Sequence, residues 1–96
     1  MKLEFHPEAA QELVDAVLRY EVELTGLGAR FDAEVRAACE TLSDYPEIGA
    51  LIDPGLRRLV LERFPYSLVY GLFGETLYIL AIAHERRPER YWSERS

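Results

Sequence analysis

The first half of the chain carries two stretches in which apolar residues recur at the spacing of an amphipathic helix. The first begins at His6-Pro7-Glu8, because proline suits the first helical position and glutamate suits the positive end of the helix dipole. It ends at a glycine-containing loop, residues 25–28. The pattern therefore predicts one helix, whose apolar stripe consists of Ala10, Leu13, Val14, Val17, Tyr20 and Leu24.

A second apolar stripe follows the loop and stops before Tyr45-Pro46. It predicts a second helix, and two helices joined by a short loop predict an antiparallel hairpin. Cys39 lies near the apolar side of this helix and is expected to be a buried packing residue. The stripe consists of Leu27, Phe31, Val35, Ala38 and Leu42.

After a predicted loop over residues 47–55, the pattern changes from helical periodicity to alternation. Residues 57–64 form one strand candidate, with Leu59 and Leu61 on one face. Pro65 interrupts it. The opposite face of this strand carries Arg58, Val60 and Glu62.

Two further strands, residues 68–73 and 77–83, flank Gly74-Glu75, a dipeptide typical of a type II′ hairpin turn. Residues 77–83 are apolar on both faces, which predicts a central strand. His84 extends the alternation of Tyr78, Leu80 and Ile82 and is expected at the rim of their face. A polar tail follows, in which Pro88 favours a short helix.

Together these elements predict an α+β fold in one domain over residues 1–96. Residues 2–5 form an N-terminal strand, and the two-helix antiparallel hairpin packs on a small antiparallel β-sheet. No internal repeat or low-complexity segment is present.

Composition narrows the class of protein. Hydrophobic residues make up 49% of the chain, enough for a packed core, and the single Cys39 excludes an internal disulfide. No apolar run approaches the roughly 20 residues of a membrane helix, and the N-terminus lacks the layout of a signal peptide. We therefore expect a cytoplasmic protein with no membrane association.

The net charge of −6 hides an asymmetry. Residues 1–54 hold four Lys and Arg against twelve Asp and Glu, whereas residues 55–96 hold seven Arg against five Glu. Attraction of the whole protein to nucleic acid is disfavoured, because counterion release needs a net cationic face. A local cationic site in the C-terminal half remains open.

Six of these arginines lie beside predicted strands, and two aromatic residues follow them. Guanidinium groups bind phosphates and carboxylates in bidentate fashion, and an exposed aromatic ring stacks on a base or fills a pocket in a partner. The alternative is that the arginines form solvated surface pairs with Glu62, Glu85, Glu89 and Glu94. Each such pair contributes about 0–1 kcal/mol to the stability of the fold. The candidate partner-binding residues are Arg57, Arg58, Arg63, Arg86, Arg87, Arg90, Tyr91 and Trp92.

Other chemistry has little support. His84 is a candidate general acid or base, although a single histidine at a strand end is more often structural. Two histidines 78 positions apart and one cysteine do not predict a metal site, and no glycine-rich phosphate loop is present. We expect neither a metal nor a cofactor.

Four stretches, in order, resemble the RelE/ParE superfamily of toxins from type II toxin–antitoxin modules. They are FHPEAAQEL, GLGARFDAEV, RRLVLERFPYSLVYGL and AIAHERRPERYW, and they cover nearly the whole chain. The resemblance implies a helical hairpin on a small antiparallel sheet. It also implies a cognate antitoxin, encoded by an adjacent gene, that wraps the toxin in a hetero-oligomer and neutralises it.

The resemblance leaves three functions open. RelE-like members cleave ribosome-bound mRNA with sheet lysines and arginines and a C-terminal tyrosine or histidine, whereas ParE-like members inhibit DNA gyrase. Lys2 is the only lysine here and the isoelectric point is about 4.9, which favours the gyrase inhibitor. A RelE-like function would use Arg57 as a further phosphate ligand and as catalytic residues Arg58, Arg63, His84, Arg87 and Tyr91.

The third function is that of a non-toxic relative that only binds an antitoxin or dimerises. His6 precedes Pro-Glu-Ala where the family more often has Ser or Thr. A serine or threonine cap stabilises a helix by about 1 kcal/mol relative to a residue that does not cap. A helix that starts less firmly is therefore expected.

Overall fold

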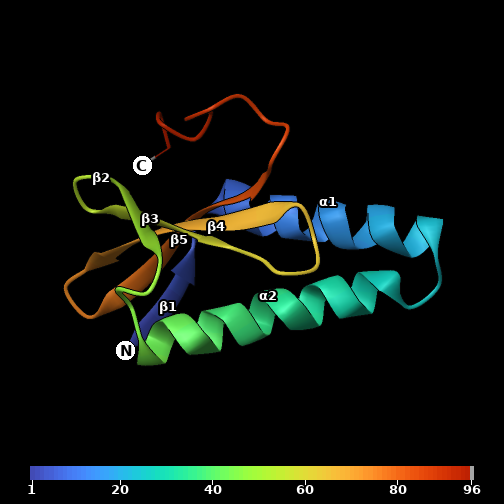
Figure 1. The fold of residues 1–96 in the computed structure, drawn as a ribbon, viewed down its shortest axis with the longest axis horizontal. Helices are drawn as coiled ribbons and strands as arrows, with labels where there is room; N and C mark the ends of the chain where they lie inside the picture. Colours follow the sequence, from blue (N-terminus) through green and yellow to red (C-terminus); the bar gives the residue numbers. More distant parts are fainter. Residues whose placement is uncertain (96) are drawn as a thin grey trace.

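Residues 1–95, described by a computed structural model, form two layers, with two helices on one face of a five-stranded sheet (Figure 1). The elements in chain order are β1 (Lys2–Phe5), α1 (Pro7–Glu23), α2 (Leu27–Asp44), β2 (Ala50–Asp53), β3 (Leu56–Val60), β4 (Tyr66–Phe73) and β5 (Thr76–His84). The α+β fold and the helical hairpin predicted from the sequence are confirmed.

The sheet has the strand order β1-β5-β4-β3-β2 and is mixed. Strands β3 to β5 form the predicted antiparallel meander, β2 adds an antiparallel strand that was not predicted, and β1 lies parallel to β5. β5 is an interior strand, as its apolar sequence predicted. Gly74 alone has a positive φ in the β4–β5 turn, 63°, which fits the predicted type II′ turn.

The face of the sheet beneath the helices holds the larger core. Phe31 of α2 is fully buried, and its ring centroid lies 5.0 Å from that of Phe64 and 4.9 Å from that of Tyr66. Cys39 is 6% exposed in the same cluster, which confirms it as a packing residue. Burial raises the pKa of its thiol to about 11.

The start of α1 differs from the expectation. The His6 Nδ1 atom accepts a hydrogen bond from the backbone N–H of Glu8 at 3.0 Å, and Pro7 occupies the first helical position. His6 thus satisfies one of the free N–H groups of the first turn, as a serine or threonine would. The expectation of an uncapped helix is wrong, because an imidazole nitrogen supplies the missing acceptor.

Two segment boundaries also differ. Residues 47–55, predicted as a loop, contain β2, which pairs with β3 and turns at Pro54 and Gly55. β3 ends at Val60 instead of residue 64, because the carboxylate of Glu34 on α2 accepts the N–H groups of Glu62 and Arg63 at 2.9 and 3.2 Å.

A β-bulge in β5 redirects its side chains. Val69 pairs with Ala81 and Tyr70 pairs with Ile79, so Leu80 is an extra residue without a partner on β4. Such an insertion reverses the alternation of faces. Leu80 faces the side away from the helices, whereas Ile82 packs into the core beneath them. His84 packs on Tyr66 of that core, so its predicted alternation with Tyr78 and Leu80 is wrong.

Candidate functional site

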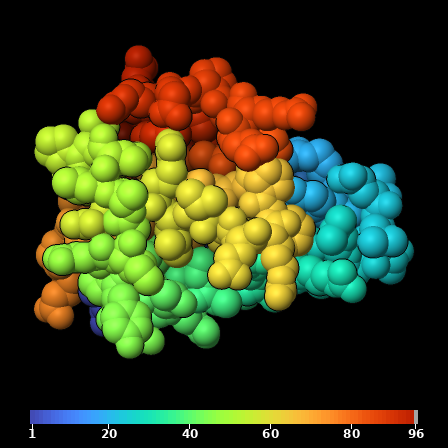
Figure 2. Space-filling model, in the orientation of Figure 1, coloured from blue at the N-terminus to red at the C-terminus, as the bar shows by residue number. Residues whose placement is uncertain are grey.

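The other face of the sheet is covered by residues 85–95, which we name the C-terminal tail (Figure 1). Figure 2 shows this tail, in red, lying on the side of the molecule away from α2. Trp92 is 3% exposed and anchors it in a second, smaller core. The expectation of an exposed Trp92 is wrong, because its ring packs with Val69, Leu80, Ala81 and Ala83.

The tail is a series of turns. The N–H groups of Arg87, Tyr91 and Ser93 each donate to the carbonyl three residues earlier, at 3.0, 3.3 and 2.9 Å. Arg90 has a φ of 62°, a left-handed conformation that interrupts a helix. The short helix predicted after Pro88 is therefore wrong, and the turns direct Trp92 onto the sheet.

Glu12 on α1 fastens the tail to the rest of the molecule. Its two carboxylate oxygens accept hydrogen bonds from the Arg95 guanidinium at 3.0 and 2.7 Å. The Glu12 carboxylate also accepts the backbone N–H of Ile82, while Arg95 donates to the carbonyl of Leu80. β1 pairs with β5 only as far as Ile79. The Glu12–Arg95 pair takes up the Leu80 carbonyl and the Ile82 N–H, which lie farther along the same edge of β5.

Tyr91 belongs to the same network. Its hydroxyl donates to Glu12 Oε2 at 2.8 Å, and the Arg87 guanidinium carbon lies 3.8 Å from the centroid of its ring. Burial, followed by the hydrogen bond to Glu12, raises the pKa of Tyr91 well above its ordinary value. The phenol therefore stays protonated at neutral pH and acts as a structural donor.

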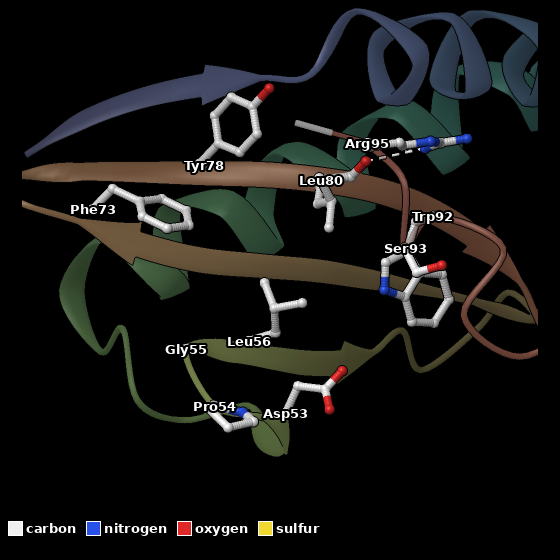
Figure 3. Close-up of a pocket in the computed structure, with 10 residues that line it drawn as sticks. All are labelled: Asp53, Pro54, Gly55, Leu56, Phe73, Tyr78, Leu80, Trp92, Ser93 and Arg95. Carbon is white, nitrogen blue, oxygen red and sulfur yellow. Dashed lines mark hydrogen bonds between the residues drawn. The ribbon is translucent and has the colours of Figure 1, made fainter.

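A hollow of about 650 Å³ opens beside the tail on this face. Figure 3 shows Trp92, Ser93 and Arg95 on one side of it, with strand residues opposite. The wall is largely apolar, and Asp53 and Arg95 place one charge of each sign at it. The strand residues in this wall are Leu56, Phe73, Tyr78 and Leu80.

Three of the predicted arginines gather around the tail. The Arg58 guanidinium carbon lies 5.5 Å from the centroid of the Trp92 ring system, and its Nη2 lies 3.7 Å from a Glu89 carboxylate oxygen. Arg90 pairs with Asp53, and Arg87 covers Tyr91. The Arg58 Nε atom is buried, and no atom of residues 1–95 accepts its hydrogen bond. The Arg58 side chain is 28% exposed overall, so the exposed part of the guanidinium, and not the buried Nε, is available to an anionic group of a partner.

The remaining arginines lie elsewhere. Arg57 donates to the carbonyls of Glu47 and Gly49, before β2. Arg63 lines a groove between α2 and the end of β3. Arg86 lies with His84 in a separate polar hollow, and its backbone N–H donates to His84 Nδ1 at 3.0 Å. The structure therefore brings Arg58, Arg87, Arg90, Tyr91 and Trp92 together around the tail. His84 and Arg86 share the polar hollow with Arg87, whereas Arg57 and Arg63 lie apart from both groups.

The sequence analysis missed both residues that hold the tail. Glu12 and Arg95 are 83 positions apart, and neither lies in a motif that predicts their contact. Asp53, the partner of Arg90, was placed in a loop. The one available signal was the surplus of arginines over glutamates after residue 54, which implied acidic partners from the first half.

Neither a metal site nor a membrane span is found in the described part of the chain. Within residues 1–95, no cluster of three or more His, Cys, Asp or Glu is suited to holding a metal ion. None of the helices there has both the length and the apolar character needed to cross a membrane.

One comparison with known proteins shows the family of this chain, and another shows a similar fold. A family model described as "ParE toxin of type II toxin-antitoxin system, parDE" matches residues 3–89. The comparison with curated proteins finds no match. A solved structure described as "Chromosomal ParDE TA system from P. aeruginosa" is similar to this chain, with a TM-score of 0.65 and 24% identity. The match covers 88% of this chain and 95% of that one, and at this identity it supports the fold.

Proposed function

Because the chain belongs to the ParE toxin family of type II toxin–antitoxin systems, we propose that it arrests growth by inhibiting DNA gyrase. We also propose that a cognate antitoxin, encoded by an adjacent gene, neutralises it. The proposal treats the protein as one that acts by binding its target. Ribosome-dependent cleavage of mRNA and a non-toxic role are the alternatives.

The observation that favours binding over RNA cleavage is the state of Tyr91. A general acid or base needs a pKa near the working pH, whereas the Tyr91 pKa is raised and its proton is committed to Glu12. Arg63, a second residue of the predicted catalytic set, lies in a different groove from Arg87 and Tyr91. The set does not form one reaction centre.

The tail face is the proposed surface for the target. It combines an apolar hollow with the guanidinium groups of Arg58, Arg87 and Arg90, whose side chains are partly exposed. Protein interfaces are enriched in this combination of apolar centre and arginine. Figure 3 shows the apolar part of this surface.

Inhibition of purified gyrase tests the target. The full chain should inhibit DNA supercoiling, and the double variant Arg87→Gln/Arg90→Gln should need about tenfold more protein, because two exposed interface charges are lost. The control is Arg36→Gln, which removes an exposed arginine paired with Asp32 on α2. Arg36→Gln should inhibit as the parent does.

Two results would reject the gyrase proposal. One is an absence of inhibition at a several-fold molar excess, combined with codon-biased mRNA cuts after induction, which identifies an endoribonuclease. The other is normal growth on induction without the adjacent reading frame, which identifies a non-toxic relative.

The groove between α2 and β3 is the proposed antitoxin surface. It measures about 980 Å³, and its floor includes Ala37, Ala38 and Leu59. The ladder between β3 and β4, in which Leu61 donates to Tyr66, points the backbone N–H and C=O of Val60 away from β4. An extended segment seated here would contact α2 and meet those backbone groups.

A matched pair of substitutions tests this groove. Ala37 and Ala29 are both exposed on α2, and only Ala37 lines the groove. Ala37→Glu should weaken the complex with the adjacent gene product by at least about tenfold, because a charge enters an apolar contact. Equal affinity for Ala37→Glu and Ala29→Glu, measured by titration calorimetry, would place the antitoxin elsewhere.

A further inference from the structure

A second hollow, of about 370 Å³, lies between α1 and the paired ends of β4 and β5. Four parts of the chain form it, because Tyr66 begins β4, His84 ends β5, and the tail supplies two arginines. It is separate from the apolar hollow beside Trp92, with no residue in both linings. The lining residues are Glu12, Asp15, Arg19, Tyr66, Ile82, His84, Arg86 and Arg87.

Two hydrogen-bond donors in this hollow have no acceptor among residues 1–95. The Tyr66 hydroxyl accepts a hydrogen bond from Arg19, which leaves its own O–H proton free to donate. The His84 Nδ1 atom accepts the N–H of Arg86, so in the neutral ring the proton is on Nε2. The Tyr66 and His84 rings pack edge to face at 4.9 Å, which holds both donors in place.

The two carboxylates that line the hollow are already engaged. Glu12 accepts hydrogen bonds from Arg95, Tyr91 and the Ile82 N–H. Asp15 accepts the side-chain amide of Gln11 at 2.8 Å. Glu12 pairs with Arg95 at 2.7 Å and lies 4.0 Å from Arg87, so the guanidinium groups of Arg19 and Arg86 outnumber the remaining carboxylate, Asp15. The hollow is therefore rich in donors and locally cationic.

We propose that this hollow binds a phosphate monoester. Its donors come from a helix, two strands and the tail, so they approach from several directions. That arrangement suits the tetrahedral oxygens of a phosphate better than a planar carboxylate, and arginine is well suited to phosphate recognition. The terminal phosphate of a nucleotide and free inorganic phosphate share this chemistry.

Titration of the full chain with inorganic phosphate and with a nucleoside 5′-monophosphate, followed by ¹⁵N–¹H NMR, tests the site. We expect saturable shifts at Tyr66, His84 and Arg86, with sodium chloride of equal ionic strength producing none. Arg86→Gln and Arg19→Gln should each weaken binding about tenfold, and Arg36→Gln should leave it unchanged. Tyr66→Phe keeps the buried ring, removes only the hydroxyl and should weaken binding about threefold.

Each outcome decides one point. A nucleotide that binds more tightly than phosphate identifies the nucleotide as the ligand source, and equal affinities identify the phosphate group alone. Shifts that sodium chloride reproduces, acetate binding as tight as phosphate, or an equal loss in Arg36→Gln would each overturn the proposal. Gyrase inhibition is measured separately and does not depend on these results.

Discussion

The two faces of the sheet are covered in different ways. On one face, two helices of 17 and 18 residues bury a continuous core of aromatic and aliphatic side chains. On the other, an irregular tail is held by one buried tryptophan, by hydrogen bonds from Tyr91 and Arg95 to Glu12, and by more exposed ion pairs such as Arg90 with Asp53. The helix face provides most of the buried apolar contact, whereas the tail face leaves room for the hollow and the arginines. The larger core thus lies on the helix side of the sheet, whereas the proposed target surface lies on the tail side and the proposed antitoxin groove lies beside α2.

The largest expected contrast comes from removing one aromatic ring from each face. Phe31→Ala should lower the free energy of unfolding by about 3–5 kcal/mol, because rigid neighbours surround the fully buried ring. Trp92→Ala should cost less, about 1.5–3 kcal/mol, because the tail can detach while the sheet stays folded. Urea unfolding measures both. Equal losses would mean that the tail belongs to the same cooperative core.

Breaking the Glu12–Arg95 pair should have the next largest effect. Arg95 has a side chain only 8% exposed, so Glu12→Gln leaves a nearly buried cation with only the exposed Glu8 carboxylate at 3.8 Å and should cost about 3 kcal/mol. The double variant Glu12→Gln/Arg95→Met should recover part of that loss. Hydrogen exchange of residues 85–95 should accelerate in Glu12→Gln. Unchanged exchange there would show that Trp92 alone holds the tail.

Alkaline pH should weaken the helix face through Cys39. Burial raises the pKa of this thiol to about 11 from an ordinary value of 9.0, so the unfolded chain loses the proton first. The contribution of the protonated Cys39 thiol to the free energy of unfolding is fully present below about pH 9. It is lost as pH rises toward 11, by about 3 kcal/mol in total. Cys39→Ala should flatten the stability profile between these values. A profile of the same slope in both proteins would reject this assignment.

The smallest expected effect is at the start of α1. His6→Ala removes the acceptor for the Glu8 N–H and should cost about 1 kcal/mol. His6→Asn, which also caps, should restore most of that loss. Thermal unfolding measures both variants. If His6→Asn is no more stable than His6→Ala, the histidine acts through its packing on Tyr78, 6.2 Å away between ring centroids, rather than through the cap.

The sequence predicts the packed side of α2 well because local periodicity specifies it. The predicted stripe of α1 is partly wrong, because Ala10, Val14 and Leu24 are exposed whereas Ala9 and Ala16 are buried. The stripe through Phe31 and Val35 identifies the side of α2 that packs, and Gly74 identifies the β4–β5 turn. The end of β3 was misjudged because a tertiary contact decides it. Residues 61–64 continue the apolar alternation, yet Glu34 takes the N–H groups that a strand would have used.

The tail face is poorly predicted because its contacts are distant in sequence. The extra residue at Leu80 reverses the faces of Ile82 and His84, and no feature of the apolar run 77–83 indicates where the bulge lies. Trp92 next to charged residues was interpreted as exposed, although it packs on Val69 and Ala81. Of the arginines considered as one cluster, Arg58, Arg87 and Arg90 lie around Tyr91 and Trp92 or Asp53, Arg86 lies in the tail but lines the polar hollow, and Arg57 and Arg63 lie elsewhere.

The pairing of β1 with β5 determines when this protein can finish folding during its synthesis. A ribosome makes Lys2–Phe5 first, but β1 has no strand partner until Thr76 to Ile79 have been made. The Glu12 carboxylate likewise cannot bind the Arg95 guanidinium until Arg95 has been made. Contacts that join the two ends of a chain form late and slowly. A nascent chain therefore carries an incomplete sheet until Thr76–Ile79 have been made, and its tail cannot be held in place until Arg95 has followed.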